Sequence, residues 1–399
     1  MSTLVQPAYP YVNVTIDTSG LVPTARRNPG VVAVVGNAAA GVSAPAATPV
    51  EVTDHASVMA AFASGTTANP LTRSLDLVLA QDPRPSRIYG VRTATADAYA
   101  GALAGLDAAD DVTFVCLAGE TDVGKATVGN TAATGLMALK EHVQQASAAG
   151  NRRIAVAMVD PGTARSPSYV ADVLADTGYG PLRSDDGRMV LVAARGATQD
   201  PTSTTDTADA AAAVMGAIAG FPPGTSMVLK RVRGFTMPVT RQYTPAEITG
   251  LAGEGVIPLI DPALIPGSGL YLADGGVFSS DAARSYLDLV TLLDQMEFTL
   301  RAGLIGAVGD SRISKAGLTS IRVRMEGIIA PFLASGVIDS YTVTIPLLAI
   351  LSLPESARDT GDTAQLVTAR QTRQVDALVV VVIAGVVHQL LVSLAPQLS

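Results

Sequence analysis

Residues 377–395 read ALVVVVIAGVVHQLLVSLA, and the structure of this run decides the class of the protein. As a helix, the run just reaches the length of about 20 mostly apolar residues that spans a bilayer. Gly385 interrupts it, however, and a polar residue such as His388 would be left unpaired against lipid. The many valines favour two strands instead, at 378–384 and 386–394. A membrane helix stays the alternative interpretation.

The predicted strand pair is almost wholly apolar. The first strand holds Val379 and Val381. In the second strand, four apolar residues fall on one face at a period of two: Val386, Leu390, Val392 and Leu394. A strand pair of this kind must be covered on both faces, and the cover can belong to another chain.

A second isolated strand is predicted near the N-terminus, at Tyr11–Asp17. Its residues alternate, with Val12, Val14 and Ile16 on one face and mostly polar residues on the other. Turn-forming residues separate it from the rest of the chain on both sides: Pro7, Pro10, Gly20, Pro23 and Pro29. The pattern is typical of a strand that extends from the protein as an arm.

The composition indicates a folded protein of two or three domains. The chain has 399 residues, of which 48% are hydrophobic and 16% charged, so it can bury generous cores. Aromatic residues make up only 4%, which leaves the interior to Ala, Val, Leu and Ile. The net charge of −8 argues against nucleic acid as a ligand, because phosphate contacts require a basic surface.

The single cysteine, Cys116, lies in an apolar run and is expected to be a buried small side chain. One cysteine excludes a disulfide within the chain and leaves a thiolate metal site without a second thiolate. The first residues, MSTLVQPAYPYVNV, have neither the basic start nor the apolar core of a signal peptide. We therefore expect the protein to fold in a cytoplasm.

The middle of the chain alternates between strands and helices. The first expected elements are strands at 31–35 and 49–52 and a helix at 56–63 that Asp54 caps. Apolar strands at 87–92, 113–118, 153–159 and 188–194 then alternate with amphipathic helices at 97–105, 132–148, 167–176 and 207–219. This alternation predicts an α/β fold with a parallel sheet covered on both faces.

After Pro266 the pattern changes to that of an α+β domain. Ser280 is expected to cap a long helix with apolar residues at the helical period: Tyr286, Leu289, Val290, Leu293, Met296 and Leu300. A second helix carries Leu318, Ile321, Met325, Ile328 and Phe332, and Pro331 kinks or ends it. A strand is expected at 341–351, followed by a polar segment at 354–373.

One segment resembles a phosphate-binding loop. Gly119–Ala126, GETDVGKA, follows a predicted strand, as such a loop requires. Ala126 stands where a hydroxyl would hold magnesium, and Glu120 and Asp122 would repel phosphate groups. We therefore interpret the segment as an ordinary loop. An α/β hydrolase or nucleotide-binding enzyme stays the alternative function.

The remaining catalytic candidates are weak. Active sites of α/β proteins usually lie at the end of a parallel strand, and none of the three histidines follows one: His55, His142 and His388. The three histidines are far apart in sequence and show no spacing of metal ligands. The paired acids Asp110-Asp111 and Asp185-Asp186 favour solvated turns over a catalytic dyad. We predict no catalytic, cofactor-binding or metal-binding residues.

The order of these features resembles the tail sheath proteins of contractile phage tails and related injection machines. The similarity covers nearly the whole chain and is carried by five segments: VVAVVGNAAAGVSAPAATPVEVTDHASVMAAFAS (31–64), IYGVRTA (88–94), ADAAAAVMGAIAGFPPGTSMVLKRV (208–232), YLDLVTLLDQMEFTLRAGLIG (286–306) and FLASGVI (332–338). None of these is a catalytic signature. At 266–276, PGSGLYLADGG lacks the arginine that many members carry there.

The resemblance implies an α/β fold whose middle domain is subtilisin-like but has no catalytic residues, with a C-terminal α+β domain and strand arms at both ends. The implied limits are 1–25 for the N-terminal arm, 26–92 for a small β-rich domain, 93–265 for the subtilisin-like domain, 266–375 for the α+β domain and 376–399 for the C-terminal arm.

The implied function is that of a structural subunit that polymerises into a contractile cylinder around a tail tube and drives the tube through a cell envelope. Its partners would be further copies, in a helical sheath or stacked rings, with the tail tube, baseplate and tail terminator proteins. No cofactor, nucleic acid or membrane insertion is expected. The protein would belong to the virion tail and assemble in the host cytoplasm.

Two sets of residues are candidates for assembly contacts. The arms would exchange strands between subunits through Tyr11, Val12, Val14 and Ile16 and through Val379, Val381, Val386, Leu390 and Val392. A basic region at 301–324 would face an acidic tube surface through Arg301, Arg312, Lys315, Arg322 and Arg324, against a single acid, Asp310. A solvated helix face is the alternative for this region.

Overall fold

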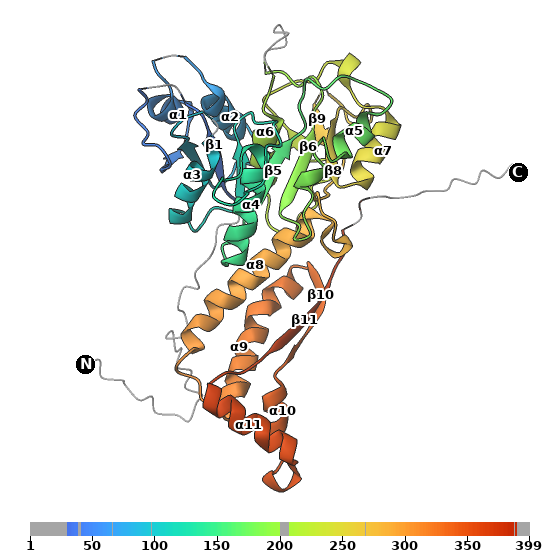
Figure 1. Ribbon diagram of the computed structural model, residues 1–399. Coiled ribbons are helices and arrows are strands. Elements are labelled where there is room, and N and C mark those ends of the chain that lie inside the picture. The colour runs from blue at the N-terminus through green and yellow to red at the C-terminus, as the bar shows by residue number, and fades with distance from the viewer. Residues whose placement is uncertain are drawn as a thin grey trace, which may run out of the picture.

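The computed structural model describes residues 30–38, 41–65, 67–96, 98–199, 207–267, 269–386 and 388. These residues form a broad α/β unit, here called the body (30–286), and a long, narrow unit that projects from its base, here called the stalk (287–386) (Figure 1). The arm strand expected at Tyr11–Asp17 lies outside the described residues, as does most of the strand expected at 386–394.

The body is built on a nine-stranded, mostly parallel sheet in the order β2-β3-β1-β4-β5-β6-β8-β9-β7. Its strands are β1 (Val31–Gly36), β2 (Pro49–Val52), β3 (Arg87–Arg92), β4 (Phe114–Leu117), β5 (Ile154–Met158), β6 (Met189–Ala193), β7 (Arg231–Val232), β8 (Val256–Ile260) and β9 (Leu270–Leu272). The strands from β3 to β8 in this order pair in parallel, whereas β2, β9 and β7 are antiparallel to their neighbours.

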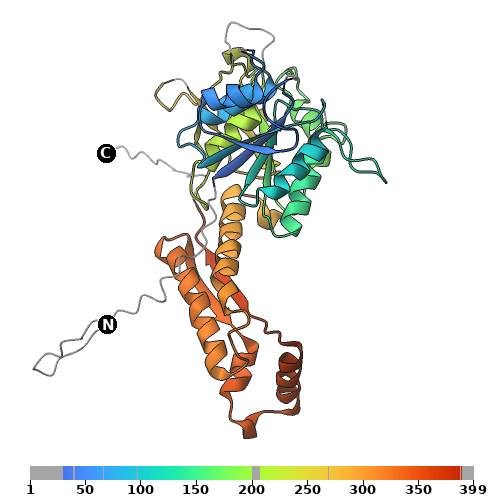
Figure 2. The same cartoon turned by 90° about the vertical axis from the view of Figure 1, so that its left-hand side faces the viewer.

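Helices cover both faces of this sheet, as Figure 2 shows. They are α1 (His55–Phe62), α2 (Pro70–Leu79), α3 (Tyr99–Ala104), α4 (Gly135–Ala148), α5 (Tyr169–Leu174), α6 (Ala210–Ala219) and α7 (Pro245–Gly253). The pair α2 and α6 packs beside β1, and α3 packs with α4. The predicted α/β alternation is confirmed, and Asp54 caps α1 as expected.

The residues of the central elements explain this packing. All six residues of β1, VVAVVG, are buried, because a parallel strand between two helical layers meets apolar side chains on both sides. Every residue of α6, AAAAVMGAIA, is buried too. A β-carbon at Gly216 would lie 3.0 Å from the Cα of Val78, so the absence of a side chain there lets α6 approach α2.

One apolar core runs through the body, starting at Val31, and also takes in Leu287 and Val290 at the start of α8. Two of the expected domain limits, after residue 92 and after residue 265, fall inside this core. β1, β2 and β3 from the segment 26–92 share the sheet with strands of the segment 93–265, and β9 extends that sheet beyond residue 265.

The stalk has two layers, helices on one side and strands on the other (Figure 1). Its elements are α8 (Leu287–Leu304), α9 (Lys315–Ala334), β10 (Ile338–Thr344), α10 (Pro346–Ser352), α11 (Thr360–Thr372) and β11 (Leu378–Ile383). β10 and β11 form an antiparallel pair whose inner side chains pack on α8 and α9. This pair forms a smaller sheet, separate from that of the body.

The run 377–395 therefore begins as a strand. β11 occupies 378–383, so the strand interpretation is confirmed for this part and the membrane helix is wrong there. No helix within the described ranges is both long and apolar enough to cross a membrane. The partner of β11 is β10 of the same chain, which the sequence did not indicate.

The expected start of the long helix at Ser280 is wrong. α8 begins at Leu287, and Asp281 caps only a short turn at 282–284. The backbone N–H of Val277 donates to the carbonyl of Ser285 at 2.9 Å, and that of Leu287 donates to Gly275 at 2.9 Å. These hydrogen bonds fix residues 285 and 287 to the segment 275–277, so the long helix cannot begin before Leu287.

The strand expected at 341–351 is correct only for its first part. β10 ends at Thr344, and Pro346 is the first residue of α10. Proline has no N–H to give to a sheet, and its fixed φ suits the first helical position. Helical spacing then buries Leu348 against Leu318 of α9.

Candidate functional site

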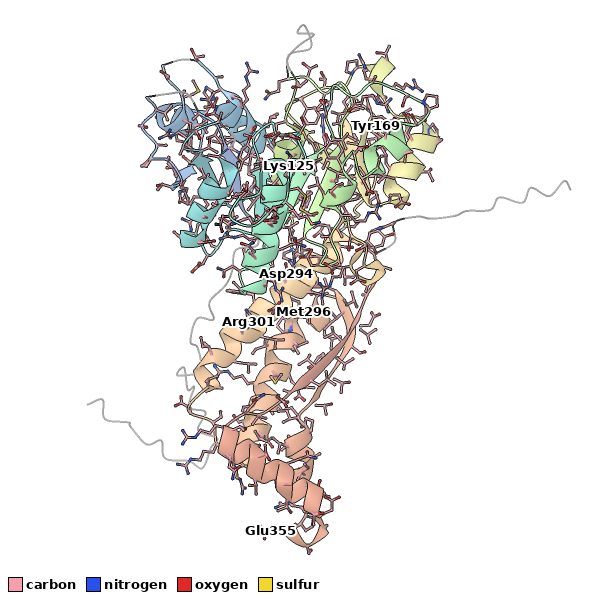
Figure 3. All side chains as sticks on the ribbon, in the orientation of Figure 1. Lys125, Tyr169, Asp294, Met296, Arg301 and Glu355 are labelled. Carbon is pink, nitrogen blue, oxygen red and sulfur yellow. The ribbon has the colours of Figure 1, made fainter. Side chains whose placement is uncertain are left out.

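The junction between body and stalk is formed by α8, which belongs to two cores. Leu287 and Val290, in its first turn, are buried in the core of the body. Leu292 and Met296 are buried in the core of the stalk. Figure 3 shows Asp294 at the base of the body and Met296 beside it in the stalk. One continuous helix therefore links the two units.

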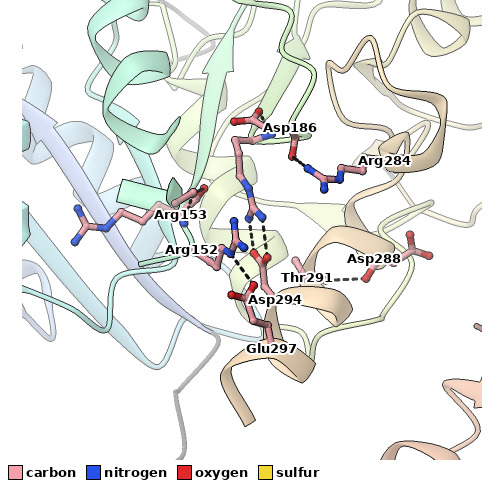
Figure 4. Close-up of polar contacts among 10 residues, drawn as sticks. Arg152, Arg153, Asp186, Arg284, Asp288, Thr291, Asp294 and Glu297 are labelled. Atoms are coloured by element: carbon pink, nitrogen blue, oxygen red, sulfur yellow. Dashed lines mark hydrogen bonds and ion pairs between the residues drawn. The ribbon is translucent and has the colours of Figure 1, made fainter. Parts of the chain in front are cut away.

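Arginines from the base of the sheet bind carboxylates of α8 at this junction (Figure 4). Arg188, just before β6, donates two hydrogen bonds to Asp294, at 2.5 and 2.8 Å. Arg152, just before β5, donates to Glu297 at 2.7 Å, and the same carboxylate pairs with Arg301 at 2.8 Å. The forked geometry of the first pair fixes both distance and direction.

This first pair is largely removed from solvent. The side chain of Arg188 is 6% exposed and that of Asp294 14%. The hydrogen bond from Arg152 to Glu297 is the main cause that raises the pKa of Arg152. Sequence reasoning missed these pairs, because the partners come from distant segments and no local spacing connects them.

The C-terminal arm candidates lie partly within the stalk. Val379 and Val381 face inward from β11 and pack on the stalk core, whereas Val386 is 49% exposed. Leu390 and Val392 lie outside the described residues, as do Tyr11, Val12, Val14 and Ile16. The structure thus places two of the nine candidates in the subunit's own sheet.

The small sheet has free edges. Among the described residues, β10 and β11 pair with each other and with no further strand. Each strand therefore presents one row of backbone N–H and C=O groups at an outer edge. Such an edge is a template for a strand from another chain.

The five basic candidates lie on α8, on α9 and in the turn between them. Arg301 pairs with Glu297 and lies beside Gly150 of the body. Arg322 pairs with Glu326 within α9 at 3.4 Å, and the guanidinium of Arg324 lies beside Gly306. The remaining two, Arg312 and Lys315, lie at the turn before α9 and at its first residue.

Backbone N–H groups of the phosphate-loop candidate at 119–126 donate hydrogen bonds to carboxylates of the same chain. Gly119 donates to the buried carboxylate of Asp209 at 2.9 Å. The carboxylate of Glu120 accepts from the next two N–H groups, at 2.9 and 2.7 Å. The carboxylate of Asp122 accepts from the N–H two residues further on. Two acidic side chains thus occupy the place of a phosphate, which supports the interpretation as an ordinary loop.

Protein side chains also fill the carboxyl end of β6, where α/β folds commonly bind ligands. The guanidinium of Arg195 is fully buried and lies over the rings of Tyr169 and Tyr243, at 4.1 and 4.6 Å from their centroids. It pairs with Glu247 at 2.6 Å. This cluster holds α5 and α7 against the sheet.

The side chain of His388 lies close to a serine and an aspartate, which the sequence did not indicate. Its Nε2 lies 3.1 Å from the hydroxyl of Ser226 and 3.7 Å from Asp288, and its ring packs edge-on to Tyr286. A catalytic triad needs the serine and the aspartate on opposite ring nitrogens. Here both face the same nitrogen, so the group anchors the chain after β11 to the body.

Cys116 is buried and His142 is half-buried. Burial raises the pKa of the Cys116 thiol well above its ordinary value, so the thiol stays protonated. Nε2 of His142 accepts a hydrogen bond from Arg153 at 2.8 Å. Burial, with the adjacent Arg153, lowers the pKa of His142 from 6.5 to about 4.

We expect the His142→Gln variant to lose less stability in acid than the wild type. The folded protein keeps His142 neutral down to pH about 4, while the unfolded chain takes up a proton below about 6.5. Stability is therefore lost as pH falls through this window, by up to roughly 3 kcal/mol. Thermal unfolding at about pH 7.5 and about pH 4.5 measures the difference. An equal acid loss in both proteins would contradict the assignment.

The fold matches known structures over nearly its full length. One match is a sheath complex of an extracellular contractile injection system (PVC) in the contracted state. The superposition spans 99% of this chain and 99% of the PVC chain, with TM-score 0.68 and 12% identity. The contracted helical sheath of the anti-feeding prophage covers 98% and 100%, with TM-score 0.65 and 12% identity. A sheath tail protein from Desulfitobacterium hafniense covers 84% and 93%, with TM-score 0.56 and 11% identity.

The chain has the fold of contractile sheath proteins. No protein-family model matches it, and no curated protein matches it in sequence. At 11–12% identity the shared property is the course of the backbone. The matches to the PVC and anti-feeding prophage sheaths extend through the stalk as well as the body, so the whole two-unit architecture is that of the sheath fold.

Proposed function

We propose that the protein is a structural sheath subunit that polymerises around a tail tube and contracts to drive the tube through a cell envelope. The observation that carries this proposal is the match of body and stalk together to the sheaths of two contractile machines. The subunit would act through assembly and not as an enzyme. Its phosphate-loop candidate is filled by its own acidic side chains, which agrees with contraction that uses no nucleotide.

Strand exchange is the proposed assembly contact. The open edges of β10 and β11 supply the acceptor, and the predicted strand at Tyr11–Asp17 and the apolar residues after His388 supply donors. Donor and acceptor differ, so the contact is heterologous and builds a helix or stacked rings of identical subunits. Strand exchange through such arms would let subunits rotate and slide without separating.

The finer assignments rest on the same proposal. The partners would be the tail tube, baseplate and tail terminator proteins. The protein would be located in the virion tail after assembly in a host cytoplasm. The body would be subtilisin-like without catalytic residues. Its parallel sheet between two helical layers and the filled carboxyl end of β6 support this assignment.

Electron microscopy of the purified full-length chain tests the function. We expect tubular polymers or rings in negative stain. Monomers that bind ATP with magnesium in a saturable manner would support the alternative of an α/β enzyme and overturn the proposal. Monomers that bind no nucleotide would also count against it.

We propose that the basic residues of α9 face the tube. Reversal of two charges, Arg322→Glu with Arg324→Glu, should weaken binding to an acidic tube surface by several-fold at low salt, because each reversed charge replaces attraction with repulsion. Co-sedimentation with tube polymers measures the effect. The control is Lys125→Glu with Arg165→Glu, which reverses two exposed charges of the body. Unchanged co-sedimentation of the double variant would show that these residues form a solvated helix face.

A further inference from the structure

The outer face of β11 is apolar and uncovered. Val379 and Val381 face the stalk core, whereas the alternate residues Leu378, Val380 and Val382 are 59%, 50% and 51% exposed. The opposing residues on β10, in register with these three, are Thr344, Thr342 and Ser340. The strand is therefore apolar on both faces, and one of them lacks a cover within the described part of the chain.

The outer face of α9 is flat and contains few long side chains. Its inner side is buried through Leu318, Met325 and Ile329. About half a turn away, exposed and mostly small residues recur at spacings of four and three: Ala316, Ser320, Val323, Gly327, Ala330 and Ala334. A β-carbon at Gly327 would meet no atom within 4 Å, so this face is open at its centre.

The two faces lie on opposite sides of the stalk. α9 buries one side against β10 and β11, and the strands bury one side against α8 and α9. The outer sides of the helix layer and the strand layer must then point away from each other. In Figure 2 the two long helices lie in front of the strands.

The charges around these faces are opposite in sign. α9 carries Lys315, Arg322 and Arg324 against one acid, Glu326, which pairs with Arg322 and leaves Lys315 and Arg324 in excess. On the strand side, Asp339 is exposed on β10, and the exposed Asp376 lies just before β11. Attraction between them favours the contact of one face with the other, whereas two copies of the same face would bring like charges together.

We propose that the outer face of β10 and β11 in one copy of this chain packs on the outer face of α9 in a second copy. Leu378, Val380 and Val382 of one copy would pack on the surface around Gly327 of the other. Because the two faces differ and lie on opposite sides, each copy binds one neighbour on each side, and the stack stays open-ended. This contact deepens the proposed function on which it rests, and it is separate from strand exchange, which uses the edges of the same sheet. It is an alternative to the tube-facing role of Arg322 and Arg324, because the same side of α9 cannot contact both a neighbouring copy and the tube.

Cysteine cross-linking tests this contact. The single natural thiol, Cys116, is fully buried, so an added cysteine dominates the chemistry. Val380→Cys and Gly327→Cys are placed in separate chains, mixed, and oxidised under assembly conditions. We expect disulfide dimers in the mixture, little dimer from either variant alone, and a ladder of higher polymers when both changes are in one chain. Val367→Cys, exposed on α11, replaces Val380→Cys in the control.

The outcomes separate this contact from the sheath function. Tubular polymers in the microscope without the mixed disulfide would overturn the contact and leave the sheath function standing. Dimers of Val380→Cys alone would show that the strand faces meet each other, and would also overturn it. If neither tubes, rings nor cross-links form, the proposed function fails and the contact fails with it.

Discussion

The Asp294→Ala variant is expected to lose about 3–5 kcal/mol of stability, the largest effect of any single side chain considered at the junction. Arg188 and Asp294 form two hydrogen bonds and are 6% and 14% exposed. Removing the carboxylate leaves a desolvated guanidinium without its partner. Chemical unfolding followed by circular dichroism gives the change in free energy.

An exposed ion pair provides the matched control. Arg322 and Glu326 lie 3.4 Å apart with side chains 44% and 38% exposed. The Glu326→Ala variant should lose less than about 1 kcal/mol, because water screens the pair and solvates the charge that remains.

Replacing both partners separates the cost of an unpaired charge from the strength of the pair. An Arg188→Leu, Asp294→Leu double variant should recover much of the stability that Asp294→Ala loses, since two apolar side chains of similar size need no partners. If Asp294→Ala cost no more than Glu326→Ala, the pair would not be holding α8 to the body.

Deleting residues 389–399, or residues 1–20, is expected to abolish tubular polymers and leave the subunit folded. The proposed exchange depends on rows of backbone hydrogen bonds, each contributing about 1 kcal/mol net. Losing several of them weakens every contact by more than about a hundredfold. Negative-stain microscopy and sedimentation measure the loss of polymer.

The position of the C-terminal deletion matters. β11 ends at Ile383, and His388 is anchored by Ser226, so a deletion from residue 389 spares both. A deletion from residue 376 would remove β11 and expose the stalk core, and its failure to assemble would say nothing about strand exchange. An unchanged circular dichroism spectrum serves as the folding control. Normal tubes from both deletions would contradict the arm hypothesis.

Much of the body could be predicted from local sequence. β1 and β6 were predicted to within a residue or two, because a parallel strand buried on both faces must be apolar throughout. The cap of α1 by Asp54 was predicted for a similarly local reason, since a side chain that accepts from the N–H three residues on needs no distant partner.

Predictions failed where a distant segment decided the local structure. Ser280 has the residue type of a helix cap, but hydrogen bonds to the segment 275–277 delay the long helix until Leu287. The apolar run after Thr344 suits a strand, but Pro346 and packing on α9 make it helical. The ion pair between Arg188 and Asp294 left no local signal, because its residues are neighbours only in space.

By itself, the sequence determined the class of the protein: an α/β unit, an α+β unit, and a terminal apolar run that forms strand and not membrane helix, at least through Ile383. These properties follow from which side chains alternate along short stretches. Only the tertiary structure decided that β11 pairs with β10 of its own chain, that α8 joins two cores, and that no described residue covers the outer faces of β11 and α9. Pairing and cover depend on which surfaces meet after folding, and a local pattern of apolar residues does not identify its partner.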